Sequence, residues 1–383
     1  MPVLLIRGAN GPIVLGAPRP MSAPQFARRS LDIGLINNMP DSALESTERQ
    51  FAELLTAASG DHLVRLRLYS LPGVPRSPSA RAYIDENYSS LDSLWDSRPD
   101  GLIVTGTEPR APELTDEPYW SGLTQIVDWA QYRTISTIWS CLAAHAAVLH
   151  LDGIRRRRLA DKRTGVFECT NISDHPWAAG IPQHFAVPHS RFNDLDRSEL
   201  AARGYNIISV SEQAGIDIFI KESRSTFVFF QGHLEYEAGT LFREYRRDVV
   251  RFLKGEREQY PAMPERYFPR ELKRCLLAFR EHALVNRRET LIADFPSLNE
   301  GLSNTWRTPA TQIYRNWLAT LSAGKKWRSG RMTATHSGKL AHSAPFNRVS
   351  RLNAAERSRL ASVGFSSAAP SAVKRVSESD SAT

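Results

Sequence analysis

Residues 136–145 have the sequence STIWSCLAAH, in which an apolar strand is followed at once by a strongly helical segment. The change falls at Cys141, which comes directly before the helix-forming run LAAHAAVL. Further along the chain, residues 226–230 have the sequence TFVFF, a second buried strand, and QGHLEY follows it. In a parallel sheet the carboxyl ends of strands meet at one edge, so a thiol and an imidazole at two strand ends can converge there.

Strand and helix patterns alternate on both sides of this segment. The predicted strands lie at residues 31–36, 62–69, 101–106, 134–140, 206–211, 216–220 and 226–230. The predicted helices lie at residues 45–58, 119–132 and 237–253, with further helical segments within 265–320. Strands separated by helices predict an α/β fold with a mostly parallel sheet that is flanked by helices. The last three strands predict a meander.

Composition divides the chain into three parts. Residues 1–30 carry four arginines and no acidic residue, which predicts a flexible leader. Organellar transit peptides share that composition, and a misplaced start with Met21 as the true first residue is the other alternative. Residues 31–320 hold the alternating pattern and form the predicted folded domain. Residues 321–383 are rich in Ser, Ala, Lys and Arg, which predicts a disordered basic tail.

The formal net charge of +8 belongs to the two ends of the chain. Residues 322–383 hold eleven Lys or Arg and three Asp or Glu, so the centre of the chain is slightly acidic. The tail has only three aromatic residues among its cations, Trp327, Phe346 and Phe365, which argues against a nucleic-acid partner. A local basic patch could still bind an anionic molecule such as a CoA nucleotide.

The sequence also limits the setting of the protein. No apolar run reaches the roughly 18–20 residues that a membrane-spanning helix needs, so no membrane partner is expected. The three cysteines, Cys141, Cys169 and Cys275, are too few and too scattered for a disulfide framework or a zinc site. We therefore expect a reducing, cytoplasmic setting.

Cys141, His233 and Glu235 are the candidate catalytic residues. A lone cysteine is usually a small buried side chain, but one at a helix N-terminus meets the positive end of the helix dipole, which favours the thiolate. Free backbone N–H groups there could also stabilise an oxyanion. His233 could accept a proton, and Glu235 could orient its ring and stabilise the cation. Together the three residues predict nucleophilic catalysis.

Short segments resemble one family in their order and spacing. They are NMP (38–40), TERQF (47–51), DGLIVTG (100–106), YW (119–120), GI (153–154), GVFE (165–168), PHSR (188–191), GHLEY (232–236), EYRRD (244–248), YFP (267–269) and NWL (316–318). The chain thus resembles the homoserine O-acyltransferases, also called homoserine transsuccinylases. The resemblance implies a flavodoxin-like α/β sandwich related to the class I glutamine amidotransferases.

The resemblance implies a ping-pong acyl transfer in residues 31–320, the catalytic acyltransferase domain. Cys141 would attack an acyl-CoA and become acylated, and His233, oriented by Glu235, would then deprotonate the hydroxyl of L-homoserine. The product would be a precursor for methionine synthesis. The resemblance implies no metal and no cofactor, with acyl-CoA as a co-substrate. It is compatible with a homodimer.

By the same match, Lys162, Ser190 and Arg247 would bind substrate. Arg247 is suited to hold a carboxylate bidentately, and Ser190 to position a polar group. Without the resemblance, Lys162 would be interpreted as part of the solvated basic run 155–163 and Arg247 as an exposed helix charge.

The chain departs from the family pattern at three places. Asp41 and its neighbours stand where lysines are typical, and Leu142 and His145 stand where Trp and Gln are usual. Arg110 stands at the position where glycine accompanies succinyl donors and glutamate accompanies acetyl donors. A guanidinium could pair with the free carboxylate of a succinyl group, so we expect succinyl-CoA rather than acetyl-CoA as the donor.

Three alternatives remain from the sequence. A glutaminase or amidotransferase-like hydrolase would use the same trio, although the nucleophile lacks flanking glycines and no synthetase domain is present. A non-catalytic relative could bind a ligand or partner instead. The acceptor could also be another hydroxy amino acid such as serine, because one methylene is worth only about 1–3 kcal/mol of discrimination.

Overall fold

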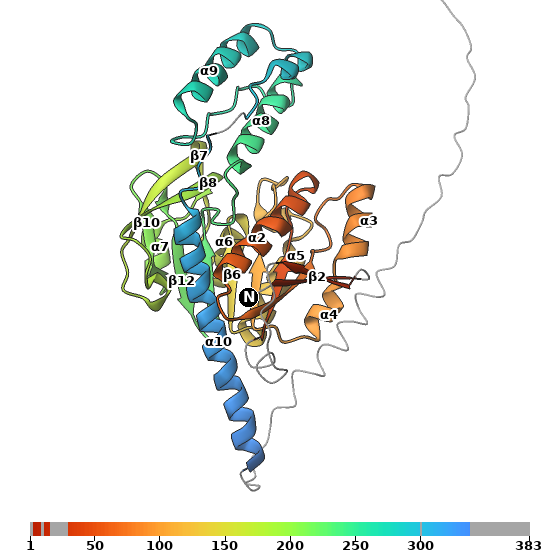
Figure 1. Ribbon diagram of the computed structural model, residues 1–383, viewed down its shortest axis with the longest axis vertical. Helices are drawn as coiled ribbons and strands as arrows, with labels where there is room; N and C mark the ends of the chain where they lie inside the picture. The colour runs from red at the N-terminus through yellow and green to blue at the C-terminus, as the bar shows by residue number, and fades with distance from the viewer. Residues whose placement is uncertain (1–2, 9–10, 16–29, 299–300, 338–383) are drawn as a thin grey trace, which may run out of the picture. The chain divides into compact units, whose positions relative to one another are not determined.

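The computed structural model describes residues 3–8, 11–15, 30–298 and 301–337 (Figure 1). Within these residues, the main sheet has nine strands in the order β2-β1-β4-β3-β5-β6-β13-β12-β9. The strands are β1 (Val3–Arg7), β2 (Gly11–Leu15), β3 (Ser30–Ile36), β4 (Leu63–Tyr69), β5 (Gly101–Val104), β6 (Ser136–Ser140), β9 (Asn206–Ile207), β12 (Ile218–Glu222) and β13 (Thr226–Phe230). The six strands from β1 to β13 run parallel, and β2, β12 and β9 pair antiparallel. The predicted α/β fold with a mostly parallel sheet is confirmed.

Helices separate the parallel strands, as the pattern predicts. The α-helices are α2 (Leu44–Ala58), α3 (Pro78–Asn87), α4 (Leu91–Trp95), α5 (Trp120–Arg133), α6 (Leu142–Asp152), α7 (Arg197–Ala202), α8 (Thr240–Leu253), α9 (Arg270–Val285) and α10 (Arg307–Ser337). Four 3-10 turns lie at Asp41–Ala43, Leu114–Asp116, Pro176–Ala178 and Glu289–Asp294. The crossovers place helices on both faces of the sheet, so its central strands are buried on both sides.

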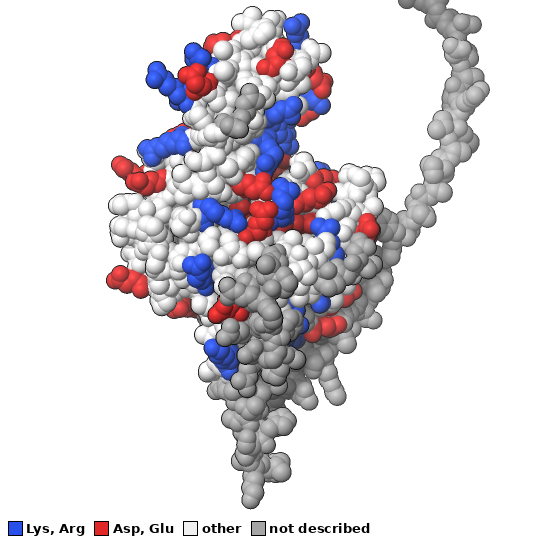
Figure 2. Space-filling model, viewed as in Figure 1, with Lys and Arg blue, Asp and Glu red and all other residues white. Residues whose placement is uncertain are grey.

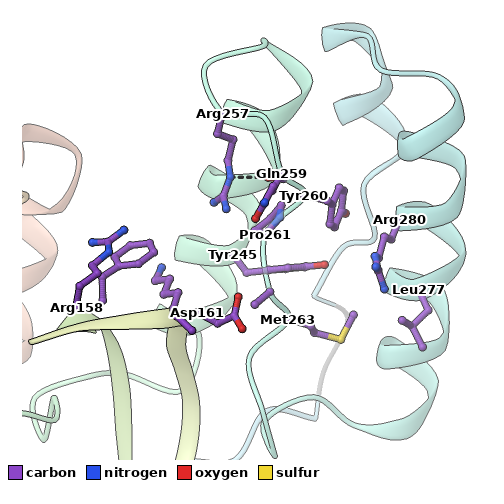
Figure 3. Close-up of a pocket in the computed structure, with 14 residues that line it drawn as sticks. Arg158, Asp161, Tyr245, Arg257, Gln259, Tyr260, Pro261, Met263, Leu277 and Arg280 are labelled. Carbon is purple, nitrogen blue, oxygen red and sulfur yellow. Dashed lines mark hydrogen bonds between the residues drawn. The ribbon is translucent and has the colours of Figure 1, made fainter. Parts of the chain in front are cut away.

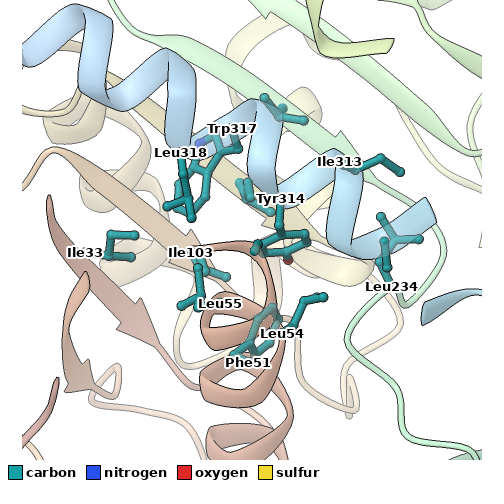
Figure 4. Close-up of a cluster of buried hydrophobic side chains, with 14 of the residues drawn as sticks. Ile33, Phe51, Leu54, Leu55, Ile103, Leu234, Ile313, Tyr314, Trp317 and Leu318 are labelled. Carbon is teal, nitrogen blue, oxygen red and sulfur yellow. The ribbon is translucent and has the colours of Figure 1, made fainter. Parts of the chain in front are cut away.

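Alternate residues of the central strands pack into two separate cores. Ile103 of β5 and Val228 of β13 face α2 and α10 in one core (Figure 4). Leu102 and Phe229 face α5 and α6 in the other. This alternation follows from the two-residue period of a strand, and it explains why the central strands are apolar throughout.

A second, four-stranded sheet was not predicted as such. Its strands are β7 (Arg157–Asn171), β8 (His184–Asp194), β10 (Ser209–Ser211) and β11 (Gly215–Ile216), in the order β11-β10-β7-β8. The long antiparallel β7–β8 pair places Thr164 opposite Ser190. The predicted meander is therefore divided, because β12 and β13 join the main sheet while β10 pairs with β7. The exposed, basic start of β7 hides its strand pattern in the sequence.

Two expected domain limits need correction. Residues 3–7 form β1, which pairs parallel with β4 and buries Val3 and Leu5, so this part of the expected flexible leader belongs to the main sheet. Helix α10 continues past the expected boundary at residue 321, because Leu321 is itself part of the core. Residues 11–15 of the expected leader form β2, which pairs with β1. Residues 1–2, 9–10 and 16–29 of the expected leader and residues 338–383 of the expected tail lie outside the described residues.

The surface and the helices give two further observations. Among the described residues, no helix combines the length and the apolar character needed to cross a bilayer. On the face drawn in Figure 2, basic and acidic side chains of the described residues are intermingled across the middle of the molecule.

Substitution of Trp317 can test whether α10 packs into the core. Its side chain is fully buried and donates an Nε1 hydrogen bond of 3.1 Å to Ser136 Oγ at the start of β6. We expect Trp317→Ala to lower the free energy of unfolding by about 3–5 kcal/mol, because it leaves a large cavity. The measurement is urea unfolding. The control is Trp327→Ala on the same helix, whose side chain is 62% exposed and which should cost far less. Equal losses for the two variants would contradict this packing.

Candidate active site

Cys141 lies on a sharp turn between β6 and α6. Its backbone has φ 53° and ψ −112°, a left-handed region that L-residues rarely occupy and that costs about 1–3 kcal/mol. The turn is held because the Cys141 N–H donates a 2.7 Å hydrogen bond to the Phe230 carbonyl of β13. The Cys141 carbonyl accepts from the N–H groups of Ala144 and His145. A strained strand-to-helix turn is the geometry that presents a nucleophile at the top of an α/β sheet.

Gly106 provides the room for this turn. A Cβ atom at Gly106 would lie 2.6 Å from Leu142 Cβ and 3.0 Å from the Leu142 nitrogen, so only glycine allows the loop after β5 to approach the start of α6. No glycine flanks Cys141 in the sequence. The sharp turn forms without one, because the close approach is made by Gly106 in the loop after the neighbouring strand β5.

His233 and Glu235 form a buried hydrogen-bonded pair three and five residues after β13. His233 Nδ1 lies 2.8 Å from Glu235 Oε1, and each residue is only 5% exposed. The His233 ring also stacks on Tyr236, with ring centroids 4.3 Å apart. Burial by itself lowers the pKa of His233, but the Glu235 carboxylate and the Cys141 thiol raise it well above its usual value. The three predicted catalytic residues therefore interact as one group.

A single cleft contains the predicted catalytic and substrate-binding residues. Cys141, His233 and Glu235 line it together with Lys162, Ser190 and Arg247. The cleft lies at the carboxyl ends of β5, β6 and β13, where ligands of open α/β sheets bind. The β7–β8 sheet and α8 supply the opposite wall.

Two carboxylates of α8, Glu244 and Asp248, organise the predicted substrate-binding residues. Lys162 Nζ lies 2.8 Å from Asp248 Oδ2 and 3.8 Å from Glu244 Oε2. Arg247 Nη2 lies 3.1 Å from Asp248 Oδ1, and the Ser190 hydroxyl donates to Glu244 Oε2. Because the two acids are four residues apart, they share one face of the helix. They hold two cations and a hydroxyl at the edge of the cleft.

The charges of this cluster balance. Burial would raise the pKa of Glu244, but Lys162 and Arg247 together with the Ser190 and Tyr236 hydroxyls lower it, so the carboxylate stays ionised. Tyr236 Oη donates a 2.5 Å hydrogen bond to Glu244 Oε1 while its ring stacks on His233. Tyr236 thereby joins the His233–Glu235 pair to the cluster of Lys162, Glu244, Arg247 and Asp248.

Comparison with known proteins shows the family to which the chain belongs. The model of the family described as homoserine O-succinyltransferase matches residues 18–325. The homoserine O-succinyltransferase of Rhodopseudomonas palustris is 51% identical over 299 residues, which cover 78% of this chain and 90% of that protein. That of Methylorubrum extorquens is 48% identical over 310 residues, which cover 80% and 92%. The chain belongs to the homoserine O-succinyltransferase family. The resemblance inferred from the sequence is confirmed.

A solved structure is also similar to the chain. It is a glutamine amido transferase from Methylobacillus flagellatus, 13% identical, with a TM-score of 0.44 over 83% of this chain and 99% of that one.

The structure does not bring Arg110 into the cleft with the other predicted site residues. Its side chain is exposed, and its backbone N–H donates a 2.5 Å hydrogen bond to Glu117 Oε1. The residues that line the cleft from this loop include Glu108 and Pro109. Glu108 pairs with Arg251 of α8 at 2.7 and 3.0 Å, which ties the loop to that helix. In this member of the homoserine O-succinyltransferase family, a role for Arg110 in donor choice stays a prediction.

Several residues of the site were not singled out from the sequence. Glu244 and Asp248 occur in the matched segment EYRRD, and their four-residue spacing on a helix was the available signal. Arg191 also lines the cleft, is 3% exposed and pairs with Asp194 at 3.1 Å. His145, by contrast, was named from the sequence as a departure from the family pattern, and it also lines the cleft. It hydrogen-bonds Gln231, and burial lowers the pKa of its ring to about 4, so it is neutral at physiological pH.

Proposed function

We propose that this chain transfers the succinyl group of succinyl-CoA to the hydroxyl of L-homoserine through an acyl-enzyme on Cys141. The observation that carries the proposal is a thiol on a strained turn, next to the buried His233–Glu235 pair, in a cleft that also holds Lys162 and Arg247. Membership of the homoserine O-succinyltransferase family supports the choice of reaction.

The first half of the proposed reaction acylates Cys141. The thiolate attacks the thioester carbonyl, a new C–S bond forms at Cys141, and the bond to the CoA sulfur breaks. The protonated His233 ring gives its proton to the departing CoA thiolate. The developing oxyanion needs hydrogen-bond donors, and the N–H groups of Leu142 and Ala143, the first two of α6, come before those that donate to the Cys141 carbonyl.

The second half transfers the acyl group to homoserine. His233, now neutral, takes the proton of the hydroxyl as its oxygen attacks the acyl carbonyl, and the Cys141 thiolate leaves. The Glu235 carboxylate stabilises the imidazolium that forms. Arg247 and Ser190 hold the amino-acid part of the acceptor, with Lys162 fixed beside them by Asp248.

The charge of the cleft supports succinyl-CoA as the donor. Its cationic lining residues are Arg156, Arg158, Lys162, Arg191 and Arg247, and its carboxylates are Glu108, Glu235 and Glu244. Lys162 and Arg247 pair with Asp248, and Arg191 pairs with Asp194, whereas Arg156 and Arg158 form no ion pair with another described residue. These two cations favour an acyl group that ends in a free carboxylate over a neutral acetyl group. Homoserine as acceptor, rather than serine, rests on the family alone.

Our proposal also covers the co-substrate, the cellular compartment and the assembly of the protein. Acyl-CoA acts as co-substrate, and no further cofactor or metal is required for a thiol nucleophile. All three cysteines are free, in keeping with a reducing, cytoplasmic setting. A homodimer is the proposed assembly, and no nucleic acid is a partner.

The acyl-enzyme can be observed directly by mass spectrometry of the intact protein. After incubation with succinyl-CoA without acceptor, we expect a mass gain of one succinyl group that is absent in Cys141→Ala and retained in Cys275→Ala, a change of an exposed cysteine. Addition of homoserine should remove the adduct. A parallel incubation with acetyl-CoA tests the donor. A gain that persists in Cys141→Ala, or no gain with either donor, contradicts the proposal.

Arg247 can be tested as the acceptor-binding residue. Arg247→Lys keeps the charge but loses bidentate geometry, so we expect the KM for homoserine to rise about tenfold while the KM for succinyl-CoA changes little. Arg246→Lys, an exposed neighbour on the same helix, is the matched control and should leave both values unchanged. Steady-state kinetics with each substrate varied in turn provides the measurement. An equal rise for both substrates would argue against a specific contact with the acceptor.

A further inference from the structure

A second cavity adjoins the cleft on the side of α9. Its volume is about 380 Å³, within the roughly 300–1,000 Å³ of small-molecule sites. Its walls come from β7, the end of β8, α8, the segment after α8 and α9 (Figure 3). Arg158, Lys162 and Phe192 line both this cavity and the cleft of Cys141, so the two are continuous along one wall.

The cavity is strongly basic. Arg158, Lys162, Arg257 and Arg280 line it, with Asp161 as the carboxylate among its lining residues. The side chains of Arg158 and Arg280 form no hydrogen bond or ion pair with another residue of the described ranges. Unpaired cations around a cavity favour an anionic ligand.

Arg257 is already oriented for such a ligand. Its Nε donates a 2.7 Å hydrogen bond to the Gln259 carbonyl, and its Nη1 lies 4.0 Å from Asp248 Oδ2. In Figure 3, Arg158 and Arg280 lie at opposite ends of the cavity, with Tyr245 and Met263 between them. Cations at both ends suit a ligand with more than one anionic group.

Aromatic side chains complete the cavity. Phe192 is 37% exposed, and the Arg158 guanidinium stacks 4.5 Å above its ring. Tyr245 and Tyr260 pack edge to face, with ring centroids 6.5 Å apart. Flat rings beside guanidinium groups can accept a planar base by stacking.

We propose that this cavity binds the nucleotide end of the acyl-CoA donor, the adenosine 3′,5′-bisphosphate part, while the pantetheine arm follows the shared wall to Cys141. The proposal rests on the proposed function, since it assumes a CoA thioester as donor. It accounts for four features together: several cations, aromatic walls, a size suited to a nucleotide, and continuity with the cleft of the nucleophile.

Arg280 gives the sharpest test because it lines this cavity and not the cleft. Two donors are compared, succinyl-CoA and succinyl-pantetheine, which carries the same thioester without the nucleotide. In Arg280→Ala we expect the KM for succinyl-CoA, relative to that for succinyl-pantetheine, to rise about tenfold, the effect of one lost charge-assisted hydrogen bond. Arg280→Glu should give a larger rise. Arg274→Ala, an exposed arginine of the same helix outside the cavity, is the control and should not change the ratio.

Binding of adenosine 3′,5′-bisphosphate, measured by calorimetry, tests the cavity without any catalysis. Wild type and Arg274→Ala should bind it alike, and Arg280→Ala about tenfold more weakly. An unchanged KM ratio together with unchanged binding in Arg280→Ala overturns the proposal. If wild type transfers from neither thioester, the proposed function fails, and the calorimetry alone then decides whether the cavity is a nucleotide site. Melting temperatures confirm that each variant is folded.

Discussion

The parallel pairing of β6 and β13 is the constraint on which the site depends. Ser140 lies opposite Phe230, so both strands end at the same level of the sheet. The hydrogen bond from the Cys141 N–H to the Phe230 carbonyl then joins the nucleophile turn to the neighbouring strand at 2.7 Å. Because of this register, Cys141 and His233 leave the sheet at one edge, although ninety-two positions separate them in the sequence. A one-residue shift would turn every side chain of β13 to the other face.

The surrounding groups determine the charge of the imidazole. His233 is buried, and burial disfavours its protonated form. The Glu235 carboxylate and the Cys141 thiol outweigh burial, so the ring keeps its proton at higher pH than a free histidine does. Tyr236 extends this arrangement to Glu244, where Lys162 and Arg247 help to keep a second carboxylate ionised. The His233–Glu235 pair and the predicted substrate-binding residues therefore belong to one connected set of charges and hydrogen bonds.

The sequence predicts the parts of the site whose position depends on strand ends. Cys141 and His233 follow buried strands with clear patterns, and the parallel sheet brings such ends together. Strand patterns do not predict the position of Lys162, because its place in the cleft depends on the pairing of β7 with β8. The start of β7 is basic and exposed, and it lacks the alternating pattern of a strand. Arg110 was assigned to the site from its position in a loop, but it does not line the cleft. Spacing along a loop does not determine which side chain enters the cleft. The N-terminal strand β1 was hidden by the arginine-rich composition around it.

The central claim is that Cys141, His233 and Glu235 act as one acid–base unit, and the pKa of His233 measures it most directly. The measurement is an NMR titration of the protein with ¹³C-labelled histidine, in which the His233 signal is assigned by its loss in His233→Asn. We predict a pKa well above the usual value of about 6.5 in the wild type, and a lower value in Glu235→Gln. A wild-type value at or below 6.5, or one that Glu235→Gln leaves unchanged, would contradict the account.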